Sequence, residues 1–263
     1  EGAIVGCAVG AAATGLRPIA ELMFCDFLTV GMDQLVNQAA KMRYMFGGKI
    51  SMPMVLRMPA GAGTGAAAQH SQSLEAWVTH VPGLKVVYPS TAEDALGLML
   101  SAIDDDNPVV YFENKLLMGV KSEVKSLEPI PLGKGRIVRE GGDLSIITYG
   151  RQVFDALKAA EELAKEGIEA EVVDLRSLYP LDTELMEQSI SKTHKAIVFT
   201  EEVKRGGYGG ELSAIIGEEM FDYLDAPVAR IGALNTPVPF APNLEQYYMP
   251  NEKDVIAAAR KMF

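Results

Sequence analysis

The sequence predicts an α/β fold of two domains, each built around a parallel β-sheet. Short apolar runs alternate with longer segments of helical periodicity, a pattern that places parallel strands between layers of helices. The alternation stops once, at about residues 117–132, where Lys, Glu, Ser, Pro and Gly dominate. With 263 residues, the chain is long enough to bury a hydrophobic core in each half.

The first alternating series occupies the N-terminal half. Its predicted helices cover residues 3–14, 29–46, 71–78 and 92–103, and its predicted strands cover residues 19–24, 54–58, 85–87 and 109–112. No strand precedes the first helix. We therefore expect either a further N-terminal segment or a second polypeptide to supply the missing part of this sheet.

The second series follows the irregular stretch. Its predicted helices cover residues 153–165, 183–191, 211–221 and 254–261, and its predicted strands cover residues 144–149, 170–174, 196–200 and 228–231. We expect an N-terminal domain at residues 1–117, a linker at 118–131 and a C-terminal domain at 132–263.

Composition narrows the class of protein. The net charge of −11 argues against a nucleic-acid surface, which needs clustered Lys and Arg, and suits a basic protein partner. No apolar run reaches the roughly eighteen residues of a membrane span, so no membrane association is expected. Cys7 and Cys25 lie in apolar stretches outside any CxxC pattern. We therefore expect both cysteines to be reduced residues of the hydrophobic core, in a protein of the cytoplasm or of an equivalent reducing compartment.

The most informative stretch surrounds His70. A glycine-rich loop, Ala60–Gly65, follows a predicted strand and leads through His70 into the predicted helix at 71–78. Open α/β sheets bind ligands at the carboxyl ends of their strands, where a titratable group can act. A hydrogen-bonded structural histidine is the alternative. Glu1 and the block Glu21–Phe27 accompany His70 in the sequence, and their presence favours a functional site over a structural histidine.

Collinear blocks along the whole chain carry a resemblance to a known family. They are Gly15–Glu21, Asp33–Gln34, Asn37–Lys41, Arg43–Gly48, Gln69–Gln72, Pro82–Val87, Asp174–Leu178, Leu224–Pro227 and Thr236–Pro239. The chain resembles the β subunit of the E1 component of thiamine-diphosphate-dependent 2-oxo acid dehydrogenase complexes, which include pyruvate, branched-chain and acetoin dehydrogenases. The resemblance implies a transketolase-like pyrimidine-binding domain followed by a transketolase C-terminal-like domain. It also implies an N-terminal segment ahead of Glu1.

The resemblance assigns roles to four residues. Glu1 matches the family's glutamate, whose carboxyl group hydrogen-bonds the pyrimidine ring of thiamine diphosphate and drives its shift to the reactive imino form. The apolar residues after Glu1 suit that bond, because water would weaken it. Phe27 matches the aromatic residue that packs on the pyrimidine, and Met23 an apolar neighbour. His70 matches the histidine that orients the substrate carboxylate and transfers protons during acyl transfer to lipoamide.

Two ion sites follow from the same resemblance. A potassium ion would be held mainly by backbone carbonyls at Met54, Ala102, Ile103, Asp105 and Asn107, near a helix C-terminus where carbonyls lack partners. Magnesium and the diphosphate need a Gly-Asp-Gly motif, which Gly141–Asp143 does not provide. Gly206–Gly210 resembles a phosphate loop but lacks its Lys and Ser/Thr. We therefore expect an α subunit to hold magnesium and to share the cofactor.

The implied assembly is a heterotetramer of two α and two β subunits in the cytoplasm, or in the mitochondrial matrix if the protein is eukaryotic. The second β subunit and the subunit-binding and lipoyl domains of the E2 acyltransferase complete the expected partners. An acidic face of the C-terminal domain would meet the basic E2 module. The residues expected on this face are Glu201, Glu202, Glu218, Glu219, Asp222, Asp225 and Glu252.

Other functions remain open at this point. The main expectation is decarboxylation of pyruvate or cleavage of acetoin, with acyl transfer to E2 lipoamide. A branched-chain 2-oxo acid dehydrogenase β subunit and a non-catalytic assembly module of the same fold are alternatives. A third is half of a split transketolase or deoxyxylulose-phosphate synthase, although Arg43–Gly48 and Gln69–Gln72 favour the dehydrogenases.

Overall fold

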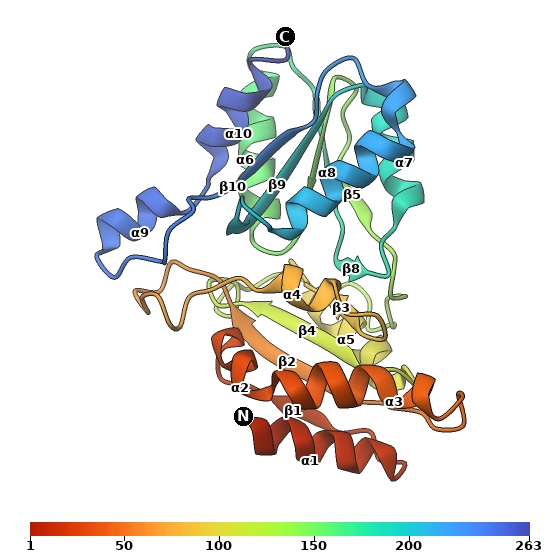
Figure 1. Ribbon diagram of the computed structural model, residues 1–263. Helices are drawn as coiled ribbons and strands as arrows, with labels where there is room; N and C mark the ends of the chain where they lie inside the picture. Colours follow the sequence, from red (N-terminus) through yellow and green to blue (C-terminus); the bar gives the residue numbers. More distant parts are fainter.

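The structure is a computed structural model that describes residues 1–263, and it consists of two α/β domains stacked end to end (Figure 1). Each domain contains a five-stranded sheet in which all pairs are parallel except one at an edge. The predicted α/β fold with two sheets is confirmed, with the difference that each sheet is mixed. No helix is long and apolar enough to cross a membrane.

The N-terminal sheet has the strand order β1-β2-β4-β3-β8. Its strands are β1 (Ile19–Glu21), β2 (Val55–Ala60), β3 (Lys85–Val87), β4 (Val109–Asn114) and β8 (Ser177–Tyr179). Its helices are α1 (Gly2–Ala13), α2 (Leu28–Met32), α3 (Ala40–Met45), α4 (Glu75–Thr79) and α5 (Ala92–Asp104), with a 3-10 turn η1 (Cys25–Phe27) and a π-helical segment η2 (Asp33–Ala39). The predicted helix at 29–46 is therefore one helical stretch, α2-η2-α3, with a π-helical middle.

In the N-terminal domain, one predicted helix and one predicted strand are clearly shorter in the structure. The helix predicted from residue 71 begins only at Glu75, because the backbone of Gln72 bonds elsewhere: its carbonyl accepts from Gly61 N, and its N–H donates to the Asp26 carboxylate. The buried strand predicted at 19–24 ends at Glu21, and Ile19 is 50% exposed because β1 lies at the sheet edge.

The C-terminal sheet has the order β10-β9-β6-β7-β5. Its strands are β5 (Arg136–Arg139), β6 (Leu144–Thr148), β7 (Ala170–Asp174), β9 (Ala196–Val203) and β10 (Ala229–Ala233). Its helices are α6 (Gln152–Ala164), α7 (Thr183–Thr193), α8 (Tyr208–Glu219), α9 (Pro242–Tyr248) and α10 (Glu252–Ala259), with a 3-10 turn η3 (Phe221–Tyr223). Helices α6 and α10 cover one face, and α7 and α8 the other (Figure 1). Sequence analysis missed β5, β8 and α9, whose patterns are too short to show periodicity.

The two domains share a strand and a core. Strand β8 follows the first strands of the C-terminal sheet in the chain, yet it pairs antiparallel with β3 of the N-terminal sheet. The Tyr208 hydroxyl of α8 donates a 2.5 Å hydrogen bond to the Leu178 carbonyl in β8. One hydrophobic cluster includes Val86 from the N-terminal sheet together with Leu178 and Ile190. The domains are therefore packed as one body through buried contacts.

A buried ion-pair network strengthens this joint. The Asp94 side chain on α5 is fully buried and accepts hydrogen bonds from Arg136 at 2.7 Å and Arg176 at 3.2 Å, both of which belong to the C-terminal half. The neighbouring carboxyl of Asp174 is also buried, and burial raises its pKa to about 6. The two arginines compensate the free-energy cost of burying the Asp94 carboxylate.

The cysteine prediction is half correct. Cys25 is buried as expected, but Cys7 is exposed because it lies on the outer face of α1.

We predict that Asp94→Ala lowers the free energy of unfolding by about 3 kcal/mol or more, because two partly buried arginines lose their buried counter-charge. Urea denaturation of the purified protein measures the change. Asp106→Ala is the control, since its ion pair with Arg17 is solvent-exposed and should contribute less than about 1 kcal/mol. Equal losses for the two variants would contradict a special role of Asp94 at the joint.

Candidate functional site

The candidate site lies where three parallel strands of the N-terminal sheet end. Strand β1 leads into Met23 and the turn η1, β2 leads into the glycine-rich loop and His70, and β4 is followed at once by Lys115. Because these strands are parallel, their carboxyl ends meet at one edge of the sheet, which faces the C-terminal domain. This placement agrees with the location expected from the sequence.

Three aromatic rings form the centre of the site. The His70 ring stands edge-to-face against Phe24, with ring centroids 4.9 Å apart, and against Phe27 at 5.2 Å. Phe24 and Phe27 contact each other at 6.0 Å in the same manner. All three are half-buried, so they present an aromatic wall that another molecule can reach. Phe27 and His70 were predicted from the sequence, whereas Phe24 was given no role there.

Lys115 fixes the backbone at His70. Its ammonium group donates a hydrogen bond to the His70 carbonyl and lies 5.3 Å from the centroid of the Phe24 ring. Burial lowers the pKa of Lys115 below its ordinary value, while the charge of Asp26 opposes that shift. Lys115 was missed in the sequence analysis, although its place directly after a strand of a parallel sheet could have indicated it.

A second anchor holds the far side of the His70 segment. The buried Asp26 carboxylate accepts hydrogen bonds from the backbone N–H and the side-chain amide of Gln72, at 3.1 and 2.9 Å. The Cys25 thiol donates to the Gln72 carbonyl at 3.1 Å. Burial raises the pKa of this thiol, so it remains a neutral donor. Cys25 is therefore a structural residue beside the site.

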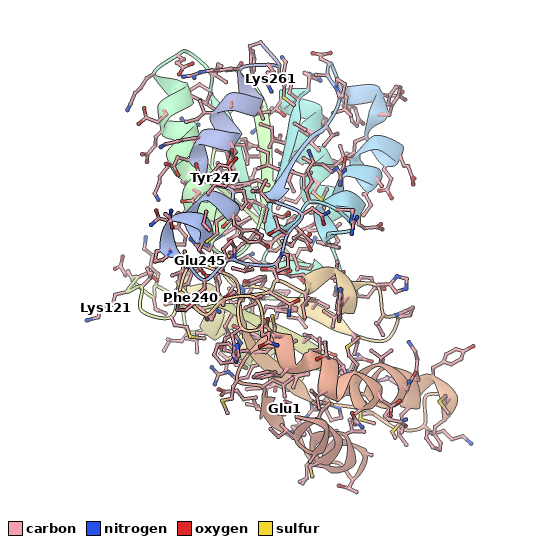
Figure 2. The ribbon with its side chains drawn as sticks, turned by 60° about the vertical axis from the view of Figure 1, so that its left-hand side comes forward. Glu1, Lys121, Phe240, Glu245, Tyr247 and Lys261 are labelled. Carbon is pink, nitrogen blue, oxygen red and sulfur yellow. The ribbon has the colours of Figure 1, made fainter.

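Glu1 and Met23 are exposed side chains of the N-terminal domain. Glu1 precedes α1, makes no side-chain capping bond and is exposed, and Met23 is 59% exposed. Helix α1 packs closely on α2, which follows Phe27 directly: a Cβ at Gly31 would lie 2.9 Å from Val5 and 3.5 Å from the Glu1 carbonyl. Figure 2 shows Glu1 on the N-terminal domain, below the junction of the two domains. Ala3 and Ile4 are exposed too, so this chain alone does not enclose the Glu1 carboxylate in apolar surroundings.

The glycine-rich loop binds carboxylates of its own protein. The N–H of Ala62 donates to Glu201 at 2.8 Å, and the N–H groups of Gly63 and Gly65 donate to the two oxygens of Glu245 at 2.8 and 3.0 Å. A backbone with positive φ at Gly61, Gly63 and Gly65 turns these donors toward the C-terminal domain. The loop therefore connects the two domains and has no free N–H cradle for a phosphate at these positions.

The prediction of an acidic face on the C-terminal domain is wrong for two of its residues. Glu201 and Glu202 are only 5% and 3% exposed and lie in the interdomain layer at the end of β9. Glu218, Glu219, Asp222 and Asp225 are exposed, and Glu252 is half-buried. The predicted strand stopped at Thr200, but β9 continues to Val203, which carries both glutamates inside.

Burial gives the interdomain carboxyls unusual proton affinity. Glu75 of α4 is fully buried, and neither of its carboxyl oxygens has a hydrogen-bond partner. Burial, together with the nearby Glu202, raises the pKa of Glu75. Burial also raises the pKa of Glu201, and that of Glu202 to about 7. These carboxyls therefore keep protons at pH values where exposed glutamates are ionised.

The positions expected to hold potassium lie together where α5 ends. The Met54 carbonyl accepts Val109 N–H at 2.9 Å, and Arg17 donates to the carbonyls of Ile103 at 2.9 Å and Asp105 at 3.0 Å. The carbonyls of Ala102 and Asn107 accept no hydrogen bond. Burial alone would raise the pKa of Asp105, but hydrogen bonds from Lys85 and Asn107 keep it below its ordinary value. Hard oxygen donors are present here, and a carbonyl has a second lone pair for a cation.

Two glycines in the glycine-containing segments of the C-terminal domain make internal contacts. Gly141 packs against the backbone of Ala170 in the turn before β6, where a Cβ would lie 2.3 Å from the Ala170 carbonyl carbon. In Gly206–Gly210, the N–H of Gly209 donates to the buried Glu202 carboxylate at 2.9 Å. No group of three or more His, Cys, Asp or Glu side chains is placed to hold a metal ion.

The fold and the site define a class of protein. A histidine packed against two phenylalanine rings, at the strand ends of an α/β domain that is joined to a second α/β domain, is the arrangement of a transketolase-like protein. The chain matches the transketolase pyrimidine-binding domain over residues 1–121 and the transketolase C-terminal domain over residues 133–255. Its fold also matches a solved structure described as a split-gene transketolase, an inactive β4 tetramer, with a TM-score of 0.84 and 27% identity over 100% of this chain and 81% of that chain.

Relatives identify the family more narrowly. The chain is 51% identical over 262 residues to the acetoin:2,6-dichlorophenolindophenol oxidoreductase subunit beta of Cupriavidus necator, covering 99% of this chain and 78% of the relative. It is 47% identical over 263 residues to the pyruvate dehydrogenase E1 component subunit beta of Rickettsia conorii, covering 100% of this chain and 81% of the relative. The chain belongs to the family of acetoin and pyruvate dehydrogenase E1 β subunits, as its sequence blocks predicted.

We predict that the melting temperature falls as the pH rises from about 5 to about 8, and that Glu202→Gln flattens this fall. The folded protein keeps the Glu202 proton up to about pH 7, whereas the unfolded chain loses it near its ordinary value of 4.5. Because the folded state binds more protons across this interval, raising the pH destabilises it. Thermal melts in a pH series measure the slope. Glu219→Gln, at an exposed carboxyl, is the control, and an unchanged slope for Glu202→Gln would refute the assignment.

Proposed function

We propose that this chain is the catalytic β subunit of an E1 dehydrogenase that decarboxylates pyruvate or cleaves acetoin and passes the acyl group to E2 lipoamide. The observation that supports this proposal most directly is the packing of His70 against Phe27 at the strand ends of a pyrimidine-binding domain. A non-catalytic module would not need a half-buried histidine held at its carbonyl by Lys115 and flanked by two aromatic rings. The names of the acetoin and pyruvate dehydrogenase relatives support the substrate class.

The residues fit one half of a thiamine diphosphate site. When bound, this cofactor supplies a nucleophilic carbon for attack on the substrate carbonyl. Phe27 offers an aromatic surface for the pyrimidine, and Met23 adds an exposed apolar side chain beside it. The Glu1 carboxyl would hydrogen-bond the pyrimidine ring nitrogen and hold a proton there. The His70 ring nitrogens would orient the substrate carboxylate and move a proton during acyl transfer.

Because Glu1 is exposed in this chain, the α subunit would have to exclude water from the Glu1 carboxyl group. A carboxyl group that must stabilise one tautomer of a heterocycle is most effective when water is excluded. In this chain, Glu1 and Met23 stay open on one side. We propose that the α subunit closes this side, contributes the magnesium and diphosphate ligands, and forms a tetramer of two α and two β subunits.

The remaining partners and ions are proposals of the same kind. We propose that potassium binds at the carbonyl cluster after α5, where the oxygens of Ala102 and Asn107 are free of hydrogen bonds. For the E2 subunit-binding domain, we propose the exposed carboxylates Glu218, Glu219, Asp222 and Asp225 as the complementary surface. The reaction would take place in the cytoplasm or, in a eukaryote, in the mitochondrial matrix.

Reconstitution tests the proposed function. The chain alone should bind thiamine diphosphate very weakly, and the chain mixed with its α subunit should bind it tightly in the presence of magnesium, because each polypeptide carries half of the site. Calorimetric titration measures binding, and dye reduction with pyruvate, acetoin and branched 2-oxo acids in parallel measures the substrate. Binding without catalysis of any of these substrates would favour the non-catalytic module.

We predict that Glu1→Gln lowers activity by about a hundredfold or more without loss of folding or of α-subunit binding. An amide cannot provide the proton that the carboxyl shares with the pyrimidine nitrogen. Steady-state dye reduction by the reconstituted enzyme measures the effect, with circular dichroism and sedimentation as checks on folding and assembly. Near-normal turnover would refute the catalytic assignment of Glu1.

We predict that His70→Ala spares cofactor binding and impairs acyl transfer to lipoamide more than decarboxylation. The imidazole would supply the proton transfer of the second step, because it is the one titratable ring among the three packed aromatic rings. Dye reduction reports the first half-reaction, and acylation of a free lipoyl domain reports the second. Equal losses in both assays would indicate a general positioning role instead.

A further inference from the structure

The segment that carries His70 is a closed loop. Gly61 N donates to the Gln72 carbonyl at 3.1 Å, which joins the two ends of the loop at its base. Between these ends, the backbone forms no helix or strand. Such a loop has many conformations available unless outside contacts select one. The position of His70 therefore depends on what holds the loop.

One contact that holds this loop comes from a residue near the C-terminal end of the sequence. Glu245 lies on α9, and its two carboxyl oxygens accept the N–H groups of Gly63 and Gly65 at 2.8 and 3.0 Å. Glu245 is only 4% exposed. Hydrogen bonds to an ionised acceptor are shorter and roughly twice as strong as neutral ones, and a bidentate pair also fixes orientation.

Glu245 and Tyr248 are the two buried residues of helix α9, and its other residues are exposed. Helix α9 and the segment before it form an arm that projects from the C-terminal domain beside the loop that follows β2 (Figure 1). Phe240 and Tyr247 are 73% and 78% exposed, and Figure 2 shows them on this arm with Glu245. Val238 and Tyr248 anchor the arm through apolar contacts, in a small cluster with Ala62 of the loop, and Met249 packs against this cluster. The Glu245 carboxylate is thus the main polar link between the arm and the loop.

The geometry points to a role for the C-terminal domain in the reaction itself: we infer that Glu245 is a positioning residue, which fixes the conformation of the Gly61–Gln72 loop and thereby the placement of His70. The inference rests on the proposed catalytic role of His70. Glu245 acts at the glycine half of the loop, while Lys115 and Asp26 act at the histidine half. Glu201 holds the start of the glycine half at the N–H of Ala62, so loss of Glu245 would free the backbone from Gly63 onward to shift His70 relative to Phe27.

The test compares Glu245→Gln with wild type in the enzyme reconstituted with its α subunit. An amide keeps one acceptor oxygen but presents N–H groups to the N–H of Gly63 or Gly65, so one bond is lost. We expect hydrogen exchange in residues 61–72 to accelerate and acyl transfer to lipoamide to slow by about tenfold or more. Glu161→Gln, which removes one carboxylate from an exposed position on α6, should change neither. Glu245→Asp, which keeps the charge on a shorter side chain, should give an intermediate loss.

A double variant separates positioning from stability. If Glu245 acts through His70, Glu245→Gln should have almost no effect on acyl transfer in a His70→Ala background. Independent, multiplicative losses would overturn the inference, as would unchanged hydrogen exchange in the loop. If Glu245→Gln fails to fold, the same cycle is run with Glu245→Asp. A His70→Ala variant with full activity would instead overturn the proposed function, so the two failures are distinguishable.

Discussion

Burial of carboxylates between the two domains is the constraint on which the rest of this structure depends. A carboxylate removed from water must accept hydrogen bonds or hold a proton. Glu201 and Glu245 solve this by accepting backbone N–H groups of the glycine-rich loop, and Glu75 does it by keeping a proton. The glycine content of the loop follows from the same need: a Cβ at Gly61 would lie 2.5 Å from a Glu201 oxygen. The loop that carries His70 is consequently shaped as much by the C-terminal domain as by its own sequence.

Much of the fold could be predicted because its longer elements have local causes. Helix α5 begins at the capping box of Thr91 and Asp94, and β7 has the predicted bounds. The site was predicted through His70 and Phe27, whose placement follows from parallel strand ends. Glu201, Glu202 and Glu245 could not be assigned, because their partners lie far away along the chain and a charged residue is otherwise expected on the surface. The contact of Lys115 with His70 is nonlocal in the same way.

The residues of the candidate site form only one side of a binding site. The aromatic wall of Phe24, Phe27 and His70 is rigidly supported from behind by Lys115 and Asp26, whereas Glu1 and Met23 face outward. Support on one side and openness on the other suit a surface that becomes a pocket only on assembly. In the C-terminal domain, Gly209 donates its N–H to Glu202 and Gly141 packs on the Ala170 backbone, so these glycines serve internal contacts.

The strand β8 has a consequence for the order in which this protein can be made. The N-terminal sheet receives its last strand from residues 177–179, which emerge from the ribosome after β6 and β7 of the other sheet. Until then, the edge of β3 exposes unpaired N–H and C=O groups, which invite pairing with other chains. Synthesis beyond Tyr179 is therefore required before the first sheet is closed, and a fragment cut at the linker would retain an open edge.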